Sequence, residues 1–388
     1  MQRAPVVLIC PDSFKESLTA NQAAQAMQAG VLAVLPQAEC LCLPLADGGE
    51  GTLAVLAEAW SLQTLRHTVS GPLGAPVTAT WGIVTHPDGK RIGVIEMAAA
   101  SGLMLLAPAQ RNPLQTSSYG FGQLMMCALM AGVDELLLTI GGSATHDGGL
   151  GMLCALGARA LDQHGQPVAA TGAGLLQVHK LDMSGLDPRW TRMPIRVICD
   201  VKNPLCGEQG AARVFAAQKG ADGHQIEQLE RASLHWAALL ANTLGERVDA
   251  LPGAGAAGGV GAALLGCLRA SLLPGIEVVL DLLGFDQLLA RADLVLTGEG
   301  RLDTQTAAGK VISGVGARCK RQNKPLVALV GSLVSDTATT LPAGVTACFA
   351  TNPIPHSLDA ALSTAAANLE LTSAQVVALW ASSFLKQG

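Results

Sequence analysis

Glycine, small hydroxyl residues and one carboxylate are concentrated in residues 139–149, which read TIGGSATHDGG. An apolar run at 133–140 precedes them and is typical of a buried strand, and apolar residues at helical spacing follow at 150–161. Glycine lets the backbone approach a ligand closely, and the first N–H groups of a helix lack intrahelical acceptors. The pattern predicts an anion-binding loop, best suited to phosphate, or else a tight strand-to-helix turn. The candidate phosphate contacts in this loop are Gly141, Gly142, Ser143, Thr145, Asp147 and Gly148.

Carboxylates and cations follow several other predicted strands. Four loops share glycine, a carboxylate or a cation, and their polar residues are Asp12, Ser13 and Lys15; Asp47 and Glu50; Asp200, Lys202 and Asn203; and Glu299, Arg301 and Asp303. Magnesium takes one or two carboxylates plus phosphate oxygens, cations neutralise a transferring phosphoryl group, and a carboxylate can accept a hydroxyl proton. The loops together predict phosphoryl transfer. The competing interpretation is that surface loops hold acids and lysines because water solvates them.

The sequence lacks a Walker A loop, the His-Arg-Asp and Asp-Phe-Gly signatures of protein kinases, and a G-x-S-x-G elbow at Ser143. Residues 253–258 match G-x-G-x-x-G, but no convincing strand leads into them. A helix start rich in small residues, or a second anion loop with Gly255 as its contact, is therefore expected in place of a Rossmann site. The histidines show no paired metal-ligand spacing, and His146 is expected to form a hydrogen bond within its loop.

The composition favours a soluble protein with an aliphatic core. Apolar residues make up 49% of the chain and charged residues 14%, below the roughly 25% that is typical. A net charge of −5 without a Lys/Arg-rich run disfavours nucleic-acid binding. Ten cysteines without a CxxC pair predict free thiols in a reducing cytoplasm. With neither a signal peptide nor a membrane span apparent, a cytoplasmic location is expected.

Strands and helices alternate at both ends of the chain. Residues 6–10 and 41–45 each predict a strand followed by an acidic loop and a helix, and Thr19 with Gln22 predicts a capping box at the first helix. The alternation returns after residue 288. Such repeats build parallel sheets, in which ligands bind beyond the carboxyl ends of the strands.

The middle of the chain has a different pattern. Residues 77–84 and 91–97 flank a turn and predict a β-hairpin. We therefore predict an α/β protein of two domains. One is a discontinuous parallel-sheet domain of residues 1–70 and 284–388, and the other is an inserted mixed α/β domain of residues 71–283.

The ordered motifs closely resemble those of the bacterial glycerate kinases of the type 1 family. The matching segments are PDSFKESL from Pro11, ADGGEGT from Ala46, IEMAAASGL from Ile95, IGGSATHDGGLGM from Ile140, CDVKNPLCG from Cys199, QKGA from Gln218, PGAGAAGG from Pro252 and TGEGRLDTQT from Thr297. They run from residue 11 to about residue 331, nearly the whole chain. His146 departs from the family, which usually has Asn there, and Lys202 stands where an acid or a small polar residue is common.

The resemblance implies ATP-dependent phosphorylation of D-glycerate to 2-phosphoglycerate, which would feed glycolysis from glyoxylate or sugar-acid breakdown. It also implies that the discontinuous domain is flavodoxin-like and that the active site lies in the cleft between the domains. Phosphorylation at O3, a kinase for another small hydroxy acid, and a non-catalytic sensor on the same scaffold stay open as alternatives. The oligomeric state is also open, with a homodimer as one expectation.

The loops and the resemblance together give a hypothesis for each site residue, with ATP and Mg²⁺ as cofactors. The expected catalytic residues are Asp47, as the base or the metal-orienting acid, with Lys15 and Asp200. The expected substrate contacts are Asp12, Ser13, Lys15, Glu50, Arg301 and Asp303, of which Lys15, Arg301 and Ser13 would hold the carboxylate. Gly255 and Glu299 join the loop residues named above as nucleotide contacts. The expected metal ligands are Asp147, Asp200 and Asn203.

Overall fold

The computed structural model describes residues 3–14, 17–46, 62–86, 88–302, 311–333, 341–352, 354 and 357–384. The chain divides into two compact units, Met1–Gly48 with Pro274–Gly388, and Gly49–Leu273. This division differs from the predicted one at both boundaries. Strand β3 (Leu62–Ser70) pairs with β4 (Pro76–Thr85) and so lies in the second unit, while helix α9 (Gly275–Leu282) packs on helices of the first.

The first unit contains a fully parallel sheet in the order β13-β12-β11-β1-β2. Its strands are β1 (Val6–Ile9), β2 (Glu39–Cys42), β11 (Leu294–Leu302), β12 (Leu326–Leu333) and β13 (Ala347–Ala350). The predicted parallel sheet is confirmed. All four residues of β1 are buried, as expected of a strand that helices cover on both faces.

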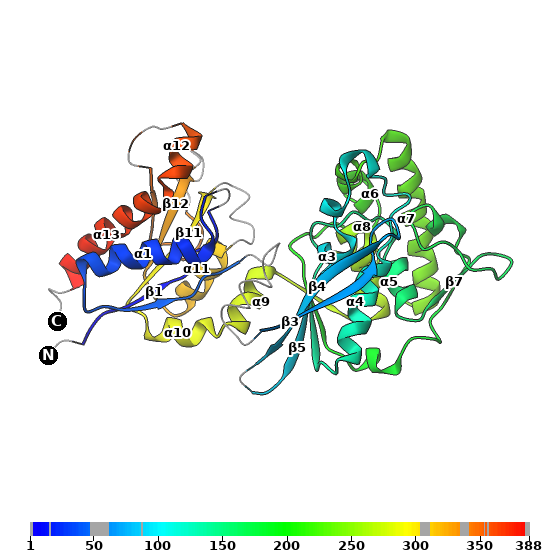
Figure 1. The fold of residues 1–388 in the computed structure, drawn as a ribbon, viewed down its shortest axis with the longest axis horizontal. Coiled ribbons are helices and arrows are strands. Elements are labelled where there is room, and N and C mark those ends of the chain that lie inside the picture. The colour runs from blue at the N-terminus through cyan, green and yellow to red at the C-terminus, as the bar shows by residue number, and fades with distance from the viewer. Residues whose placement is uncertain are drawn as a thin grey trace. The chain divides into compact units, whose positions relative to one another are not determined.

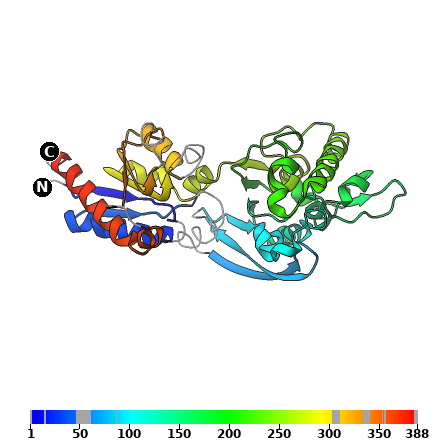
Figure 2. The same ribbon diagram turned by 90° about the horizontal axis from the view of Figure 1, so that it is seen from above.

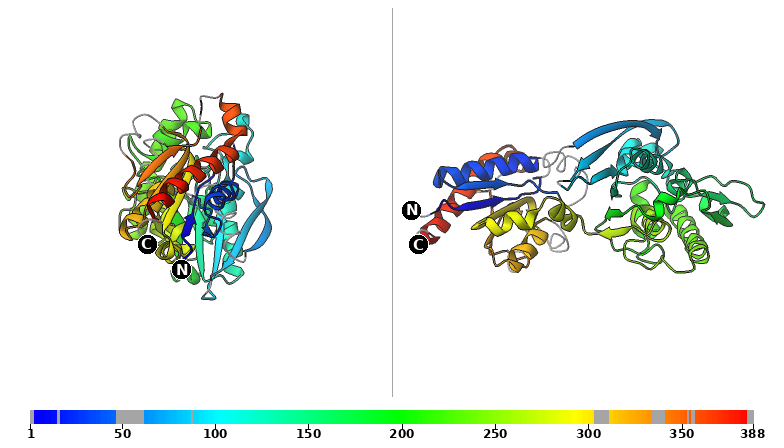
Figure 3. Two further views of the ribbon diagram at one scale, coloured as in Figure 1. Left: turned by 90° about the vertical axis from the view of Figure 1, so that its left-hand side faces the viewer. Right: turned by 90° about the horizontal axis from the view of Figure 1, so that it is seen from below.

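Helices cover both faces of this sheet (Figure 1). They are α1 (Ala20–Val34) and α13 (Ala365–Phe384) on one face, and α9, α10 (Phe285–Arg291) and α11 (Val311–Arg321) on the other. Figure 2 shows the first pair in blue and red and the second group in yellow and orange, and the right-hand view of Figure 3 shows the same two layers from below. A short helix, α12 (Leu358–Ser363), precedes α13.

Helix α1 begins at the predicted capping box. The Thr19 hydroxyl accepts from the Gln22 N–H at 3.2 Å, and the Gln22 side chain accepts from the Thr19 N–H at 2.9 Å. These two bonds satisfy donors that the first helical turn leaves unpaired. Met27 and Val31 then pack against the sheet and α13. The helix is therefore fixed both at its start and along its apolar face.

The second unit contains a mixed sheet in the order β10-β9-β6-β5-β4-β3. The remaining strands are β5 (Arg91–Glu96), β6 (Glu135–Thr139), β9 (Ile195–Ile198) and β10 (Ser271–Leu273). Strands β5, β6, β9 and β10 run parallel, and β3, β4 and β5 are antiparallel neighbours. The predicted hairpin is confirmed by the pairing of β4 with β5.

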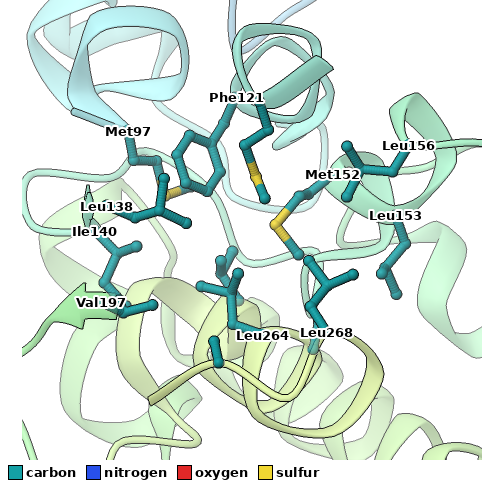
Figure 4. Packing of buried hydrophobic residues seen from close by; sticks show 14 of the residues in the cluster. Met97, Phe121, Leu138, Ile140, Met152, Leu153, Leu156, Val197, Leu264 and Leu268 are labelled. Atoms are coloured by element: carbon teal, nitrogen blue, oxygen red, sulfur yellow. The ribbon is translucent and has the colours of Figure 1, made fainter. Parts of the chain in front are cut away.

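One hydrophobic core joins the helices of this unit to its sheet. Figure 4 shows side chains of β6, β9 and the neighbouring helices packed together, among them Phe121, Leu138, Met152 and Leu264. The helices in contact are α4 (Tyr119–Met130), α5 (Leu150–Ala155) and α8 (Ala256–Cys267). Because Ile140 and Met152 both lie in this core, the loop between β6 and α5 is anchored at each end.

The helix predicted at 150–161 is shorter than expected. Helix α5 ends at Ala155, and β7 (Arg159–Leu161) pairs antiparallel with β8 (Lys180–Asp182). Gly157 lies between them at φ 112°, where a Cβ would meet the Gly185 carbonyl oxygen at 2.3 Å. The chain turns at this glycine. The apolar residues of 156–161 therefore belong to strand β7 and to the segment that leads into it. Among its described residues, the unit also contains the helices α3 (Ala98–Ser101), α6 (Ala211–Phe215) and α7 (Gly223–Leu244).

Candidate functional site

The carboxyl ends of four parallel strands meet at one edge of the second sheet. Glu96 of β5 is level with Thr139 of β6, Thr139 with Ile198 of β9, and Ile198 with Leu273 of β10. The Gly141–Gly142 turn leaves β6 at this edge and Asp200 leaves the adjacent strand β9, and all three residues are exposed. The structure thus brings two of the predicted loops to neighbouring strand ends, where α/β proteins bind ligands.

The Asp147 carboxylate occupies the start of α5. It accepts from the Ser118 N–H at 2.7 Å, the Ser118 hydroxyl at 2.8 Å, the Gly149 N–H at 3.2 Å and the Gly151 N–H at 3.1 Å. The Ser118 hydroxyl also accepts from the Met152 N–H at 2.9 Å. Burial raises the pKa of Asp147, and these hydrogen bonds act in the opposite direction.

This arrangement bears on two expectations. The N–H groups at the start of α5 were expected to face an anion, but Asp147, Ser118 and the backbone accept from them. Asp147 was also expected near the metal, but it is fully buried and four donors from the chain surround it. Its position favours a structural role, and the ligand-accessible part of the loop is the exposed Gly141–Gly142 turn.

A buried lysine lies directly behind this turn. The Lys219 ammonium donates to the Ser143 hydroxyl at 2.9 Å and to the Thr145 carbonyl oxygen at 2.7 Å, and the side chain is 3% exposed. Burial lowers the pKa of Lys219 to about 7, and the charge of Asp147 opposes that shift. We did not predict a site role for Lys219. The sequence signal that marks it is the QKGA segment, which is one of the ordered family motifs.

His146 is buried in the same loop and forms a hydrogen bond, but to helix α7 and not within the loop as expected. Its Nε2 lies 3.0 Å from the Ser233 hydroxyl oxygen of α7, and that hydroxyl donates to the Leu229 carbonyl at 2.9 Å. Because the hydroxyl proton is committed to Leu229, Nε2 carries the proton of the His146 ring. Burial, and next the charge of Lys219, lower the pKa of His146 to about 3, so the ring is neutral near neutral pH.

The glycines deeper in the loop serve close packing. Gly148 has φ 62°, and a Cβ there would lie 2.6 Å from the Trp236 ring. Gly258 has φ 67°, and a Cβ there would meet the Thr145 carbonyl oxygen at 2.2 Å. The Gly148 N–H donates to the Gly258 carbonyl oxygen at 3.0 Å. The 253–259 segment therefore packs its backbone directly against the back of the loop.

Gly255 was expected to contact nucleotide, but it too is buried against backbone. A Cβ at Gly255 would meet the Pro204 carbonyl oxygen at 2.1 Å, and its N–H donates to the Asn203 carbonyl at 3.0 Å. No strand of the described chain leads into this segment, since residues 246–255 form turns after α7. Although α8 is assigned from Ala256, Ala257, Gly258 and Gly259 have positive φ values of 53°, 67° and 92°, so the segment is a left-handed turn and the regular helix follows it.

The loop after β9 carries two expected metal ligands. The Asn203 side-chain amide donates to the Gln209 carbonyl at 2.8 Å, which fixes its orientation within the loop. Asp200 is exposed at the strand end. Across the described ranges, no group of three or more His, Cys, Asp or Glu could hold a metal ion. Any metal bound at Asp200 would therefore need most of its ligands from elsewhere.

The first unit brings four predicted residues to the carboxyl edge of its own sheet. The Asp12 N–H donates to the Gly298 carbonyl at 2.8 Å, which places Asp12 and Ser13 beside β11 at the point where Glu299 follows. The Asp12 carboxylate accepts from the Ser13 N–H at 2.6 Å. Glu299 is buried and Arg301 is exposed on the same strand. The other candidates lie outside the described residues: Lys15, Asp47, Glu50 and Asp303.

The fold and these strand ends define a class of protein. An α/β protein with a glycine turn and carboxylates beyond its parallel strands is of the class that binds small-molecule ligands at that edge. All ten cysteines are free thiols. No helix in the described ranges has the length and apolar character needed to cross a membrane.

The sequence profile of the glycerate kinase family matches residues 7–381. A protein named glycerate kinase from Halalkalibacterium halodurans is 46% identical over 356 residues, which cover 92% of this chain and 93% of that protein. A protein named glycerate 2-kinase from Escherichia coli K12 is 43% identical over 372 residues, 96% and 97% of the two chains.

The crystal structure of a candidate glycerate kinase 2 from Salmonella typhimurium LT2 superposes with a TM-score of 0.88 at 44% identity, over 98% of this chain and 100% of that one. The chain belongs to the glycerate kinase family.

Proposed function

We propose that this protein is a glycerate 2-kinase that transfers the γ-phosphoryl group of ATP to the 2-hydroxyl group of D-glycerate. The observation that carries the proposal is the family match over residues 7–381, with 43% identity to a protein named glycerate 2-kinase. The Gly141–Gly142 turn beside Asp200 supports it, because phosphoryl transfer depends on positioned phosphates and charge neutralisation. The two compact units would be the two domains of this kinase, the second inserted into the first.

Magnesium is proposed to arrive with the nucleotide. A single exposed carboxylate at a strand end, Asp200, fits an ion that keeps phosphate oxygens and water as its other ligands. When bound, Mg²⁺ neutralises charge on the transferring phosphate. In this proposal the Gly141–Gly142 turn presents backbone N–H groups to the nucleotide phosphates. Asp147, whose carboxylate accepts from Ser118 and Gly151, would keep that turn in place.

The acceptor side is proposed to lie at the strand ends of the first unit. Ser13, Lys15 and Arg301 would bind the glycerate carboxylate, because cations and a hydroxyl suit that group. Asp12 holds the Ser13 backbone in position. The glycerate hydroxyl oxygen would form a bond to the γ-phosphorus as the bond to the β,γ-bridging oxygen breaks. The hydroxyl proton would pass to Asp47, and ADP would leave.

The test is ADP release from Mg-ATP with and without D-glycerate, with the phosphorylated product then supplied to enolase. Glycerate-dependent ADP and direct enolase turnover are expected. ADP formation without enolase turnover would indicate phosphorylation at O3 and overturn the proposed regiochemistry. No ADP with glycerate, but ADP with another small hydroxy acid, would overturn the proposed substrate.

A further inference from the structure

The Ser143 side chain is held by a cation that no ligand can reach. Lys219 is 3% exposed and Ser143 is 7% exposed, so both side chains are buried, whereas the adjacent Gly141–Gly142 turn is exposed. When Lys219 is protonated its ammonium group only donates, so in that form the Ser143 oxygen is the acceptor of the 2.9 Å contact. Among the residues that the structure describes, the Ser143 hydroxyl makes no other hydrogen bond, and its own proton is therefore available.

The backbone around Ser143 is also fixed. The Leu103 N–H donates to the Gly142 carbonyl at 2.8 Å, and the Ala144 N–H donates to the Ser101 carbonyl at 2.9 Å. These bonds flank Ser143, which faces Gly102 in an antiparallel bridge. In such a position the residue's own N–H and C=O point away from the partner segment. The Ser143 backbone N–H is thus directed away from residues 101–103, next to a side chain whose oxygen is held by Lys219.

We propose that Lys219 is a positioning residue that fixes the Ser143 hydroxyl oxygen as an acceptor and so directs the Ser143 proton to a nucleotide phosphate oxygen at the Gly141–Gly142 turn. This inference rests on the proposed function, because it identifies phosphate as the ligand of the turn. Lys219 itself touches no substrate. Its bond to the Thr145 carbonyl keeps the ammonium in place below the loop.

Titration calorimetry of Mg-ADP binding tests the proposal without requiring turnover. Ser143→Ala and Lys219→Met are each expected to weaken Mg-ADP binding about tenfold, since a hydrogen bond supported by a charge contributes at least that much. The two residues act through one hydrogen bond. The Mg-ADP affinity of the double variant should therefore equal that of whichever single variant binds less tightly. Lys219→Arg, which keeps a buried donor and cation, should recover part of the loss. Lys180→Met, at an exposed lysine of the same unit, is the matched control and should bind normally.

Steady-state kinetics separate positioning from a general structural effect. The KM for Mg-ATP should rise in both single variants while the KM for D-glycerate stays within about twofold. Equal changes in both KM values, or effects that multiply in the double variant, would overturn the proposal. If Lys219→Met lacks a cooperative melting transition, Ser143→Ala decides alone, and normal Mg-ADP affinity in that variant is contrary evidence. A wild-type protein that binds Mg-ADP but releases no ADP with glycerate contradicts only the proposed function.

Discussion

Two ionisable side chains near the glycine turn, His146 and Lys219, are buried, and their burial determines their protonation. His146 is fully buried and Lys219 nearly so, and both pKa values are lowered, to about 3 and about 7. A buried base with a lowered pKa makes the native state bind fewer protons than the unfolded chain at intermediate pH. Stability therefore increases with pH between the native and the unfolded pKa of each group.

His146 should make the protein sensitive to acid. The unfolded side chain takes up a proton below about pH 6.5, whereas the native ring stays neutral down to about pH 3, so this group lowers stability as pH falls across that range. As the pH falls from about 6.5 to about 3, the His146→Asn variant should therefore lose less stability than the wild-type protein. Urea unfolding at several pH values measures the difference. Parallel pH profiles would contradict it, and His164→Asn, at an exposed histidine, should leave the profile unchanged.

Asp147 should matter for stability more than for metal binding. Asp147→Asn replaces one accepting oxygen with a donor that faces the Ser118 and Gly151 N–H groups. Buried donors left without an acceptor cost about 1–3 kcal/mol each, so we expect the free energy of unfolding to fall by at least about 2 kcal/mol. Denaturant unfolding measures it. Unchanged stability together with a raised Mg²⁺ requirement would instead restore the metal role expected from the sequence.

At the scale of elements, a single arginine joins three segments of the first unit. Arg318 of α11 donates to Glu277 at 2.5 Å, to Asp281 at 2.6 Å and to Asp286 at 2.6 Å, and its side chain is 7% exposed. Glu277 and Asp281 belong to α9, and Asp286 belongs to α10. One cation thus holds two neighbouring helices against α11 and offsets part of the negative charge of their three carboxylates.

Arg318→Met should leave three carboxylates facing one another without a counter-charge. We expect unfolding free energy to fall by about 2–3 kcal/mol, below the loss for a fully buried pair because the carboxylates are partly exposed. The loss should shrink at about 1 M salt, where screening acts over ~3 Å. Thermal melting at low and high salt measures both. Arg321→Met, at an exposed residue of the same helix, is the control, and an equal loss there would contradict the assignment.

At the scale of the whole molecule, the second unit is one continuous segment of chain. Its six-stranded sheet and its principal core use residues between Leu62 and Leu273 only. The first unit, in contrast, takes strands from both ends of the chain. A continuous segment with its own sheet and core is expected to fold alone.

The fragment of residues 49–273 should therefore unfold cooperatively and keep the environment of its buried tryptophans, Trp81, Trp190 and Trp236. Near-ultraviolet circular dichroism and urea unfolding check this. A fragment that lacks near-ultraviolet signal, or that unfolds without a cooperative transition, would show that its core depends on the first unit. The Lys219–Ser143 contact lies wholly within this fragment, so it should survive the excision.

The amino-acid sequence determined the local elements and the family. Strand, glycine loop and helix after residue 133, the capping box at Thr19 and the hairpin before Met97 all depend on neighbouring residues, and ordered motifs gave the resemblance. Only tertiary structure decided what the loop residues do. Ser118 is 29 positions from Asp147, and Lys219 is 76 positions from Ser143. A carboxylate or hydroxyl can face either a ligand or a buried partner, and packing between segments far apart in the sequence decides which. No local sequence pattern encodes such long-range contacts.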